Sequence, residues 1–119
     1  MTAMPTVAAN GIELCYETFG DPADPTLLLV NGLGSQMINF DEDLCGQFAA
    51  RGFHVVRYDN RDTGLSTHID AKVDVMRVLR ARGAGEPIPP VPYTLSDMAA
   101  DAVALLDHLG VARAHVLGT

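Results

Sequence analysis

A short apolar run between turn residues constrains the fold of this 119-residue chain more than any other feature. Residues 26–30 read Thr-Leu-Leu-Leu-Val, with Pro22 and Pro25 before them and Gly32 and Gly34 after them. The run is too short for a buried helix, and it lacks the polar alternation of a half-exposed strand. It therefore predicts a strand that is buried on both faces, as in parallel sheets.

Apolar spacing then predicts a helix and a second strand. Over residues 40–51, Phe40, Leu44 and Phe48 recur every four positions, which places them on one helix face. Residues 54–58, His-Val-Val-Arg-Tyr, predict the next strand. Two strands joined through a helix run parallel, because the crossover returns the chain to the same end of the sheet.

The flanking segments extend this unit. Residues 6–19 alternate around an Asn-Gly dipeptide, which predicts a β-hairpin. A helix that begins after Thr94 or Ser96 and runs to Leu109 carries an apolar stripe, and residues 114–117 predict a last strand. The expected fold is α/β: an antiparallel hairpin leads into a mostly parallel sheet with helices on both faces.

Residues 67–93 are the least regular stretch. Four prolines and a Gly-Ala-Gly sequence predict a surface excursion there, with a helical piece over residues 73–79. A chain of this length can bury one modest core. Residues 1–119 are therefore expected to form one domain or the N-terminal portion of one.

Charge and cysteine usage narrow the function. Fifteen acidic and eight basic residues give a net charge of −7, which argues against nucleic acid and favours a small neutral or apolar substrate. No apolar run approaches the roughly 18 residues of a membrane helix, and no export signal is evident. Cys15 and Cys45 fit no Cys-x-x-Cys pattern, so we interpret them as buried thiols of a cytoplasmic protein.

The loops that follow the parallel strands are expected to form the site, since ligands bind there in open α/β sheets. Gly32 and Gly34 let the first loop approach a substrate and direct a backbone N–H at it, which suits an oxyanion hole. A dinucleotide-binding turn is the alternative, with Asp59 as the ribose-binding acid. It is disfavoured because Met37 stands where the third glycine belongs.

Three motifs along the chain resemble the start of an α/β-hydrolase, and more narrowly bacterial esterases of the lipase and methyl-esterase type. They are Asn-Gly-Leu-Gly at 31–34, Tyr-Asp-Asn-Arg-Asp-Thr-Gly-Leu-Ser at 58–66, and Val-Leu-Gly-Thr at 116–119. The resemblance spans nearly the whole chain. It implies the N-terminal portion of a single α/β-hydrolase domain.

The first motif in that family usually reads His-Gly-x-Gly, and the residue after its first glycine gives a backbone N–H to the oxyanion hole. This role maps onto Leu33, with Gly32 and Gly34 as loop support. Asn31 replaces the histidine, which leaves the backbone role intact but changes what the side chain can hydrogen-bond. Ser35 either touches a substrate or caps the following turn.

The second motif usually reads Asp-x-Arg-Gly-x-Gly-x-Ser and braces the loop near the site. Asp59, Arg61, Gly64 and Ser66 match it, whereas Asp62 stands in place of its first glycine. We interpret Asp59 and Arg61 as a local charge-assisted pair.

The third motif is the nucleophile elbow, Gly-x-Ser-x-Gly, whose first two positions fit Gly118 and Thr119. The resemblance implies that the nucleophile, the acid and the histidine lie beyond residue 119, in about 130 to 180 further residues or a second chain. That missing C-terminal part is the expected partner. Without it, residues 114–117 would form an unpaired apolar edge, and the chain should not be a stable soluble monomer.

The function so implied is a serine hydrolase that cleaves carboxylic esters through an acyl-enzyme, without a cofactor or a metal. Two alternatives stay open. One is a dehalogenase or epoxide hydrolase with an aspartate nucleophile, and the other is a non-catalytic ligand-binding protein of the same fold.

The histidines and a run of acids are interpreted as structural. A general base must lie within about 3 Å of its nucleophile, and none of the four histidines is placed to do so. Three consecutive acids in the first turn of a helix point in different directions and favour helix stabilisation over metal binding. These residues are His54, His68, His108, His115, Asp41, Glu42 and Asp43.

Overall fold

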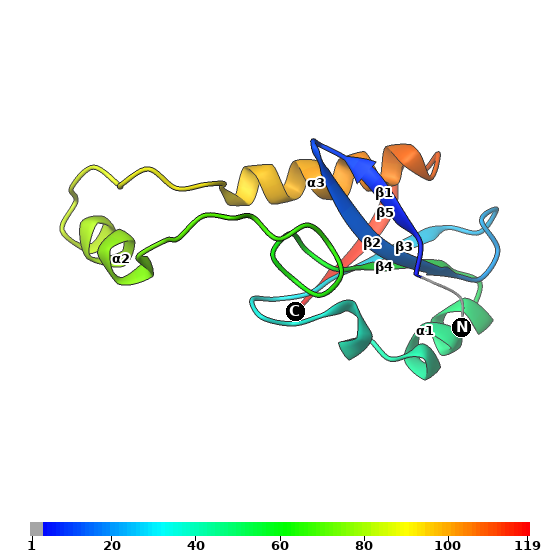
Figure 1. The fold of residues 1–119 in the computed structure, drawn as a ribbon. Coiled ribbons are helices and arrows are strands. Elements are labelled where there is room, and N and C mark those ends of the chain that lie inside the picture. The colour runs from blue at the N-terminus through cyan, green and yellow to red at the C-terminus, as the bar shows by residue number, and fades with distance from the viewer. Residues whose placement is uncertain (1–3) are drawn as a thin grey trace.

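The computed structural model describes residues 4–119 and contains a five-stranded mixed sheet with the order β1-β2-β4-β3-β5 (Figure 1). β3 runs parallel to both β4 and β5, whereas β2 pairs antiparallel with β1 and β4. This confirms the predicted α/β class. The strands are β1 (Thr6–Ala9), β2 (Ile12–Phe19), β3 (Thr26–Val30), β4 (His54–Tyr58) and β5 (Ala114–Gly118).

The N-terminal hairpin turns at the predicted dipeptide. Asn10 and Gly11 have φ of 53° and 80°, and Ala9 pairs with Ile12. Two consecutive positive φ angles characterise the two-residue turn whose twist matches that of the flanking strands. The hairpin prediction is confirmed.

Helices cover both faces of the sheet. α1 (Glu42–Ala50) packs on one face and α3 (Leu95–His108) on the other, while α2 (Val75–Gly83) lies away from the sheet (Figure 1). The core is accordingly divided into two clusters. Leu28, Val56, Tyr58 and Leu105 are buried on the α3 side, and Leu27, Leu29, Phe40, Cys45 and Val55 on the α1 side.

The predicted start of α1 at Phe40 is wrong. Asp41 is the N-cap and its carboxylate accepts the N–H of Leu44 at 2.8 Å, so the helix begins after Phe40. Leu44 is then 37% exposed, and Cys45 is buried in its place. A short 3₁₀ turn, η1 (Met37–Asn39), precedes the cap. The strong preference of a carboxylate for the N-cap fixes the helix start, and Phe48 still packs against the core cluster that contains Phe40 and Cys45.

The cap of α3 resolves the choice between two candidates. Thr94 is the N-cap and forms a capping box with Asp97. The C-terminal half of α3 packs Leu105 into the core, but Val103 is 57% exposed. Val116 of β5 is 65% exposed, and β5 lies at the sheet edge as predicted. An apolar strip along α3 and β5 is therefore uncovered within residues 4–119.

The excursion contains the expected helical piece at a shifted position. α2 begins after Asp74, whose carboxylate accepts the N–H of Arg77 at 3.1 Å, and it ends at Gly83. Figure 1 shows α2 at the tip of a long arm that leaves the sheet after β4 and returns at α3. No helix within residues 4–119 is long and apolar enough to span a membrane.

Candidate functional site

The ends of three adjacent strands meet at one edge of the sheet. Val30 pairs with Gly118 across β3 and β5, and β4 lies on the other side of β3. The N–H of Thr119 donates to the carbonyl of Val30 at 3.1 Å, and the N–H of Gly32 donates to Oγ1 of Thr119 at 3.3 Å. The loop after β3 therefore lies against the end of β5.

The middle of the β3 loop, residues 31–36, projects into solvent. Leu33 is fully exposed, and the N–H of Ser35 donates to the carbonyl of Gly32 at 3.2 Å to close a turn. Gly34 has a φ of 77°, which favours glycine. Within residues 4–119 the N–H of Leu33 makes no hydrogen bond. The turn leaves this donor free for another acceptor.

Both ends of the β3 loop are held by residues that follow β4. Asn60 donates from Nδ2 to the carbonyl of Asn31 at 3.0 Å, and Oδ1 of Asp59 accepts the N–H of Met37 at 2.8 Å. All four residues are buried. The loop is therefore fixed at both ends and free in the middle. Sequence reasoning missed Asn60, although its place at the end of a parallel strand is a signal that could have found it.

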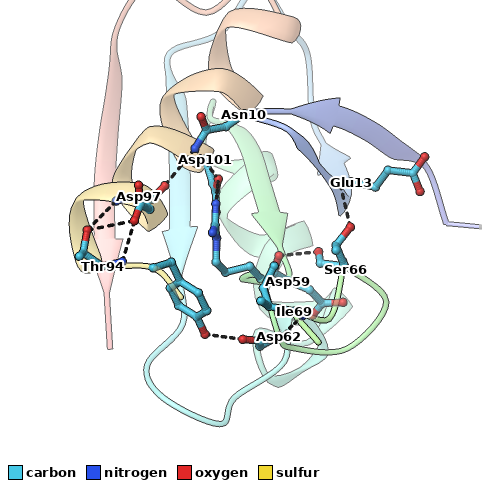
Figure 2. Close-up of polar contacts among 12 residues, drawn as sticks. Asn10, Glu13, Asp59, Asp62, Ser66, Ile69, Thr94, Asp97 and Asp101 are labelled. Carbon is cyan, nitrogen blue, oxygen red and sulfur yellow. Dashed lines mark hydrogen bonds and ion pairs between the residues drawn. The ribbon is translucent and has the colours of Figure 1, made fainter. Parts of the chain in front are cut away.

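The β4 loop, residues 59–67, folds around the carboxylate of Asp59 (Figure 2). Oδ2 of Asp59 accepts the N–H of Leu65 at 3.0 Å, and Oγ of Ser66 donates to the Asp59 carbonyl at 2.7 Å. Ser66 also accepts the N–H of Cys15 at 2.9 Å, which ties the loop to β2. Gly64 has a φ of 52°, and a Cβ there would overlap the Asp59 carboxylate. Only glycine fits that position without a shift.

The expected pairing of Asp59 with Arg61 is wrong. Arg61 instead forms two hydrogen bonds of 2.7 Å with the carboxylate of Asp101 on α3. The Asp59 carboxylate is already occupied by backbone N–H groups, and Arg61 faces α3. The hydrogen bond to Asp101 raises the pKa of Arg61 above its usual value. Asn10 donates a bond of 2.9 Å to Asp101, so this buried carboxylate joins the β4 loop, α3 and the hairpin turn.

Asp62 connects the β4 loop to the excursion. It has a φ of 65°, and its carboxylate accepts the N–H of Ile69 and the hydroxyl of Tyr93, each at 2.5 Å. The guanidinium of Arg61 lies 4.9 Å from the centre of the Tyr93 ring. The hydrogen bond to Asp62 raises the pKa of Tyr93 to about 12. Sequence reasoning did not single out Tyr93.

An apolar groove of about 400 Å³ opens between α3 and the sheet, beside the β3 loop. Asn31 contributes to its wall, and Nδ2 of Asn31 is buried without a partner within the described residues. Burial raises the pKa of Tyr58, which also lines the groove, to about 12. The other lining residues are mostly apolar: Leu28, Val30, Asn60, Leu95, Met98, Ala99, Ala102, Val103, Leu106 and Val116.

No histidine within the described chain forms a hydrogen bond with a serine. Nδ1 of His54 lies 3.0 Å from Oγ1 of Thr26, where β3 and β4 begin, at the edge opposite the site. Nε2 of His68 lies 3.0 Å from the carbonyl of Gly64. The two other histidines lie edge-on to aromatic rings, His108 to Tyr16 and His115 to Phe53.

Two curated relatives match almost the full length of this chain. It is 34% identical over 117 residues to the rhodomycin D methylesterase DauP of Streptomyces sp. (strain C5), covering 97% of this chain and 34% of the relative. It is also 34% identical over 117 residues to the putative carbamate hydrolase RutD of Caulobacter segnis, covering 36% of it. The chain thus spans about a third of the length of these relatives. No protein-family model matches it.

Solved structures share the architecture. The enol-lactonase from Burkholderia xenovorans LB400 superposes with a TM-score of 0.72 at 28% identity, over 96% of this chain and 36% of that one. Epoxide Hydrolase A from Mycobacterium thermoresistibile superposes with a TM-score of 0.73 at 23% identity, over 98% of this chain and 30% of that one. The second likeness bears on the fold alone.

Proposed function

Because this chain has the architecture of the N-terminal part of an α/β-hydrolase, we propose that it forms the first part of a serine esterase that cleaves carboxylic esters. The rest of the enzyme, as a continuation of the chain or as a second chain, is the proposed partner and supplies the nucleophile, the acid and the histidine. The methylesterase and enol-lactonase names of similar proteins support this reaction class. We place the enzyme in the cytoplasm, in keeping with two free buried thiols.

One observation carries the proposal. The free N–H of Leu33 projects from a loop that touches the end of β5, through the contact between Gly32 and Thr119. A nucleophile that follows Thr119 would lie beside this donor. An ester carbonyl under attack there would place its oxygen close to the Leu33 N–H, which is the geometry that an oxyanion hole requires.

The proposed mechanism assigns this chain a binding and stabilising role. The nucleophile attacks the ester carbonyl, and the N–H of Leu33 donates to the oxygen that becomes negatively charged. Collapse of the tetrahedral intermediate expels the alcohol and leaves an acyl-enzyme, which water then hydrolyses. Asp59 and Asn60 hold the ends of the β3 loop, so the donor needs no rearrangement during the reaction.

Two other functions make different predictions. With an aspartate nucleophile the protein would be an epoxide hydrolase or a dehalogenase. The identity of residue 120 distinguishes this alternative from a serine esterase. A non-catalytic binding protein would keep the groove and lack an activated nucleophile.

Covalent labelling of the complete protein tests the proposal. A fluorophosphonate reacts with an activated serine, so we expect stoichiometric labelling at residue 120 and hydrolysis of a short p-nitrophenyl ester. Absence of both labelling and hydrolysis would contradict the proposed function.

A further inference from the structure

One carboxylate of the β4 loop binds residues at both ends of the excursion. Ile69 and Tyr93 flank residues 70–92, which we call the arm, and both bind the side chain of Asp62 (Figure 2). Oδ1 of Asp62 accepts the N–H of Ile69, and Oδ2 accepts the hydroxyl of Tyr93. The two ends are thereby held together at the point where the arm leaves the β4 loop.

Asp62 makes these bonds from an unfavourable backbone conformation. Its φ of 65° lies in the left-handed region, and its own N–H is fixed by a bond of 2.9 Å to the carbonyl of Thr67. The loop thus imposes a geometry that suits glycine best, and the α/β-hydrolase motif has glycine there. A side chain kept in such a conformation points to a role for that side chain.

The arm stands on the side of the molecule where the site lies. It follows the β4 loop, and Tyr93 connects it to Thr94, the cap of α3. Leu95, the first residue of α3, lines the same groove as Asn31. A shift of the arm at Tyr93 would therefore be transmitted to the wall of that groove.

We propose that Asp62 is a positioning residue, a latch whose carboxylate fixes the arm beside the site so that the arm contributes to substrate binding. The role rests on the proposed ester hydrolase function. Asp62 touches no reacting atom, so it acts on the affinity for the substrate and not on the chemical step. Its carboxylate is solvent-exposed, which keeps each bond weak and the latch able to open.

The rate of proteolysis within the arm measures how often the arm opens, and this measurement does not require enzyme activity. Lys72, Arg77, Arg80 and Arg82 all lie in the arm and are exposed, so trypsin can cut there when the arm opens. We expect Asp62→Gly, in the complete protein, to accelerate cleavage within the arm about tenfold, since two hydrogen bonds are lost. Glycine suits the backbone of this position, so the variant should fold. Asp70→Asn removes a neighbouring exposed charge and should change the rate less than twofold.

A second variant isolates one of the two bonds. Tyr93→Phe keeps the ring under Arg61 and removes only the hydroxyl, so we expect cleavage about threefold faster. The phenol provides a spectroscopic check. Its raised pKa of about 12 means that the bond to Asp62 is intact below about pH 10 and is lost as the pH rises through 12. In Asp62→Gly, the Tyr93 phenol should ionise closer to its ordinary pKa of about 10.

Kinetics then test the positioning role. For p-nitrophenyl esters with a long acyl chain, Asp62→Gly and Tyr93→Phe should raise KM about threefold to tenfold and leave kcat within twofold. Unchanged arm cleavage in Asp62→Gly would overturn the latch. Faster cleavage with unchanged KM, or a fall in kcat alone, would overturn the positioning role. If no variant labels with fluorophosphonate, the proposed function and the positioning role both fail, while cleavage still decides whether the latch exists.

Discussion

The loops after β3 and β4 follow neighbouring parallel strands, yet they are built in opposite ways. In the β3 loop Leu33 is fully exposed, and its N–H is free within the described chain. In the β4 loop Asp59, Arg61 and Ser66 are buried, and each makes at least two hydrogen bonds. One loop offers an unused donor, and the other uses the side chains of Asp59, Arg61 and Ser66 in hydrogen bonds within the protein.

The difference explains how a free donor can be held in place. A loop that satisfies its own polar groups is rigid, but it has nothing left to offer a ligand. The buried polar side chains of the β4 loop are occupied by partners in the protein, and two of them, Asp59 and Asn60, fix the β3 loop. The β4 loop thus supplies the rigid support, and the β3 loop supplies the free donor. Preorganised donors are effective in catalysis because they need not move when charge develops.

The largest expected effect comes from removing the anchor of the β4 loop on α3. Asp101→Ala leaves Arg61 buried without its partner, and breaking a buried pair typically costs about 3 to 5 kcal/mol. Denaturant unfolding of the complete protein measures this loss. The double variant Arg61→Met, Asp101→Leu leaves no unpaired charge and should recover most of the stability. Equal losses in the single and double variants would mean that the pair does not anchor the loop.

The next effect concerns the exposed donor. Leu33→Pro removes the N–H and should lower kcat about a hundredfold to a thousandfold with little change in KM, as loss of one oxyanion donor does. Leu33→Ala keeps the N–H and should retain most activity, because the side chain is exposed. Steady-state kinetics on both variants measure the contrast. Equal and mild effects would count against an oxyanion donor at this position.

Local pattern was sufficient to predict most of the fold. The strands at 26–30 and 54–58 have the predicted bounds, because a buried run between turn residues is a property of neighbouring positions. The Asn10-Gly11 turn was predictable for the same reason. The start of α1 was not, since Phe40 fits a helical stripe and only the cap at Asp41 excludes it from the helix.

The candidate site was predictable only at the level of its loops. The strand order brings Gly32 and Thr119 together, and the motifs had already marked both. The partner of Arg61, in contrast, lies 40 positions away on α3. The partner of Asp62, Tyr93, lies 31 positions away across the excursion. Hydrogen bonds of such separation depend on tertiary packing, which a sequence pattern does not specify.

A matched pair of glycines tests whether the two loops differ in how tightly they are packed. Gly34 and Gly64 both have positive φ, but a Cβ at Gly34 meets nothing within 4 Å, whereas one at Gly64 overlaps the Asp59 carboxylate. Gly34→Ala should cost about 1 kcal/mol of backbone strain. Gly64→Ala should cost about 2 to 3 kcal/mol, because the carboxylate must also move. Thermal unfolding of both variants measures the difference, and equal costs would remove the contrast between the loops.

The smallest effect should come from one of the two contacts that join the loops. Asn60→Ala removes the donor to the buried Asn31 carbonyl, a loss of about 1 kcal/mol. Because the bond holds the β3 loop, we expect kcat to fall about threefold to fivefold, with KM nearly unchanged. Asn39 provides the control: it is exposed, its side chain makes no hydrogen bond within residues 4–119, and Asn39→Ala should alter neither constant. If both substitutions have the same effect on kcat, the β4 loop does not position the Leu33 donor through Asn60, and Asp59 alone would connect the two loops.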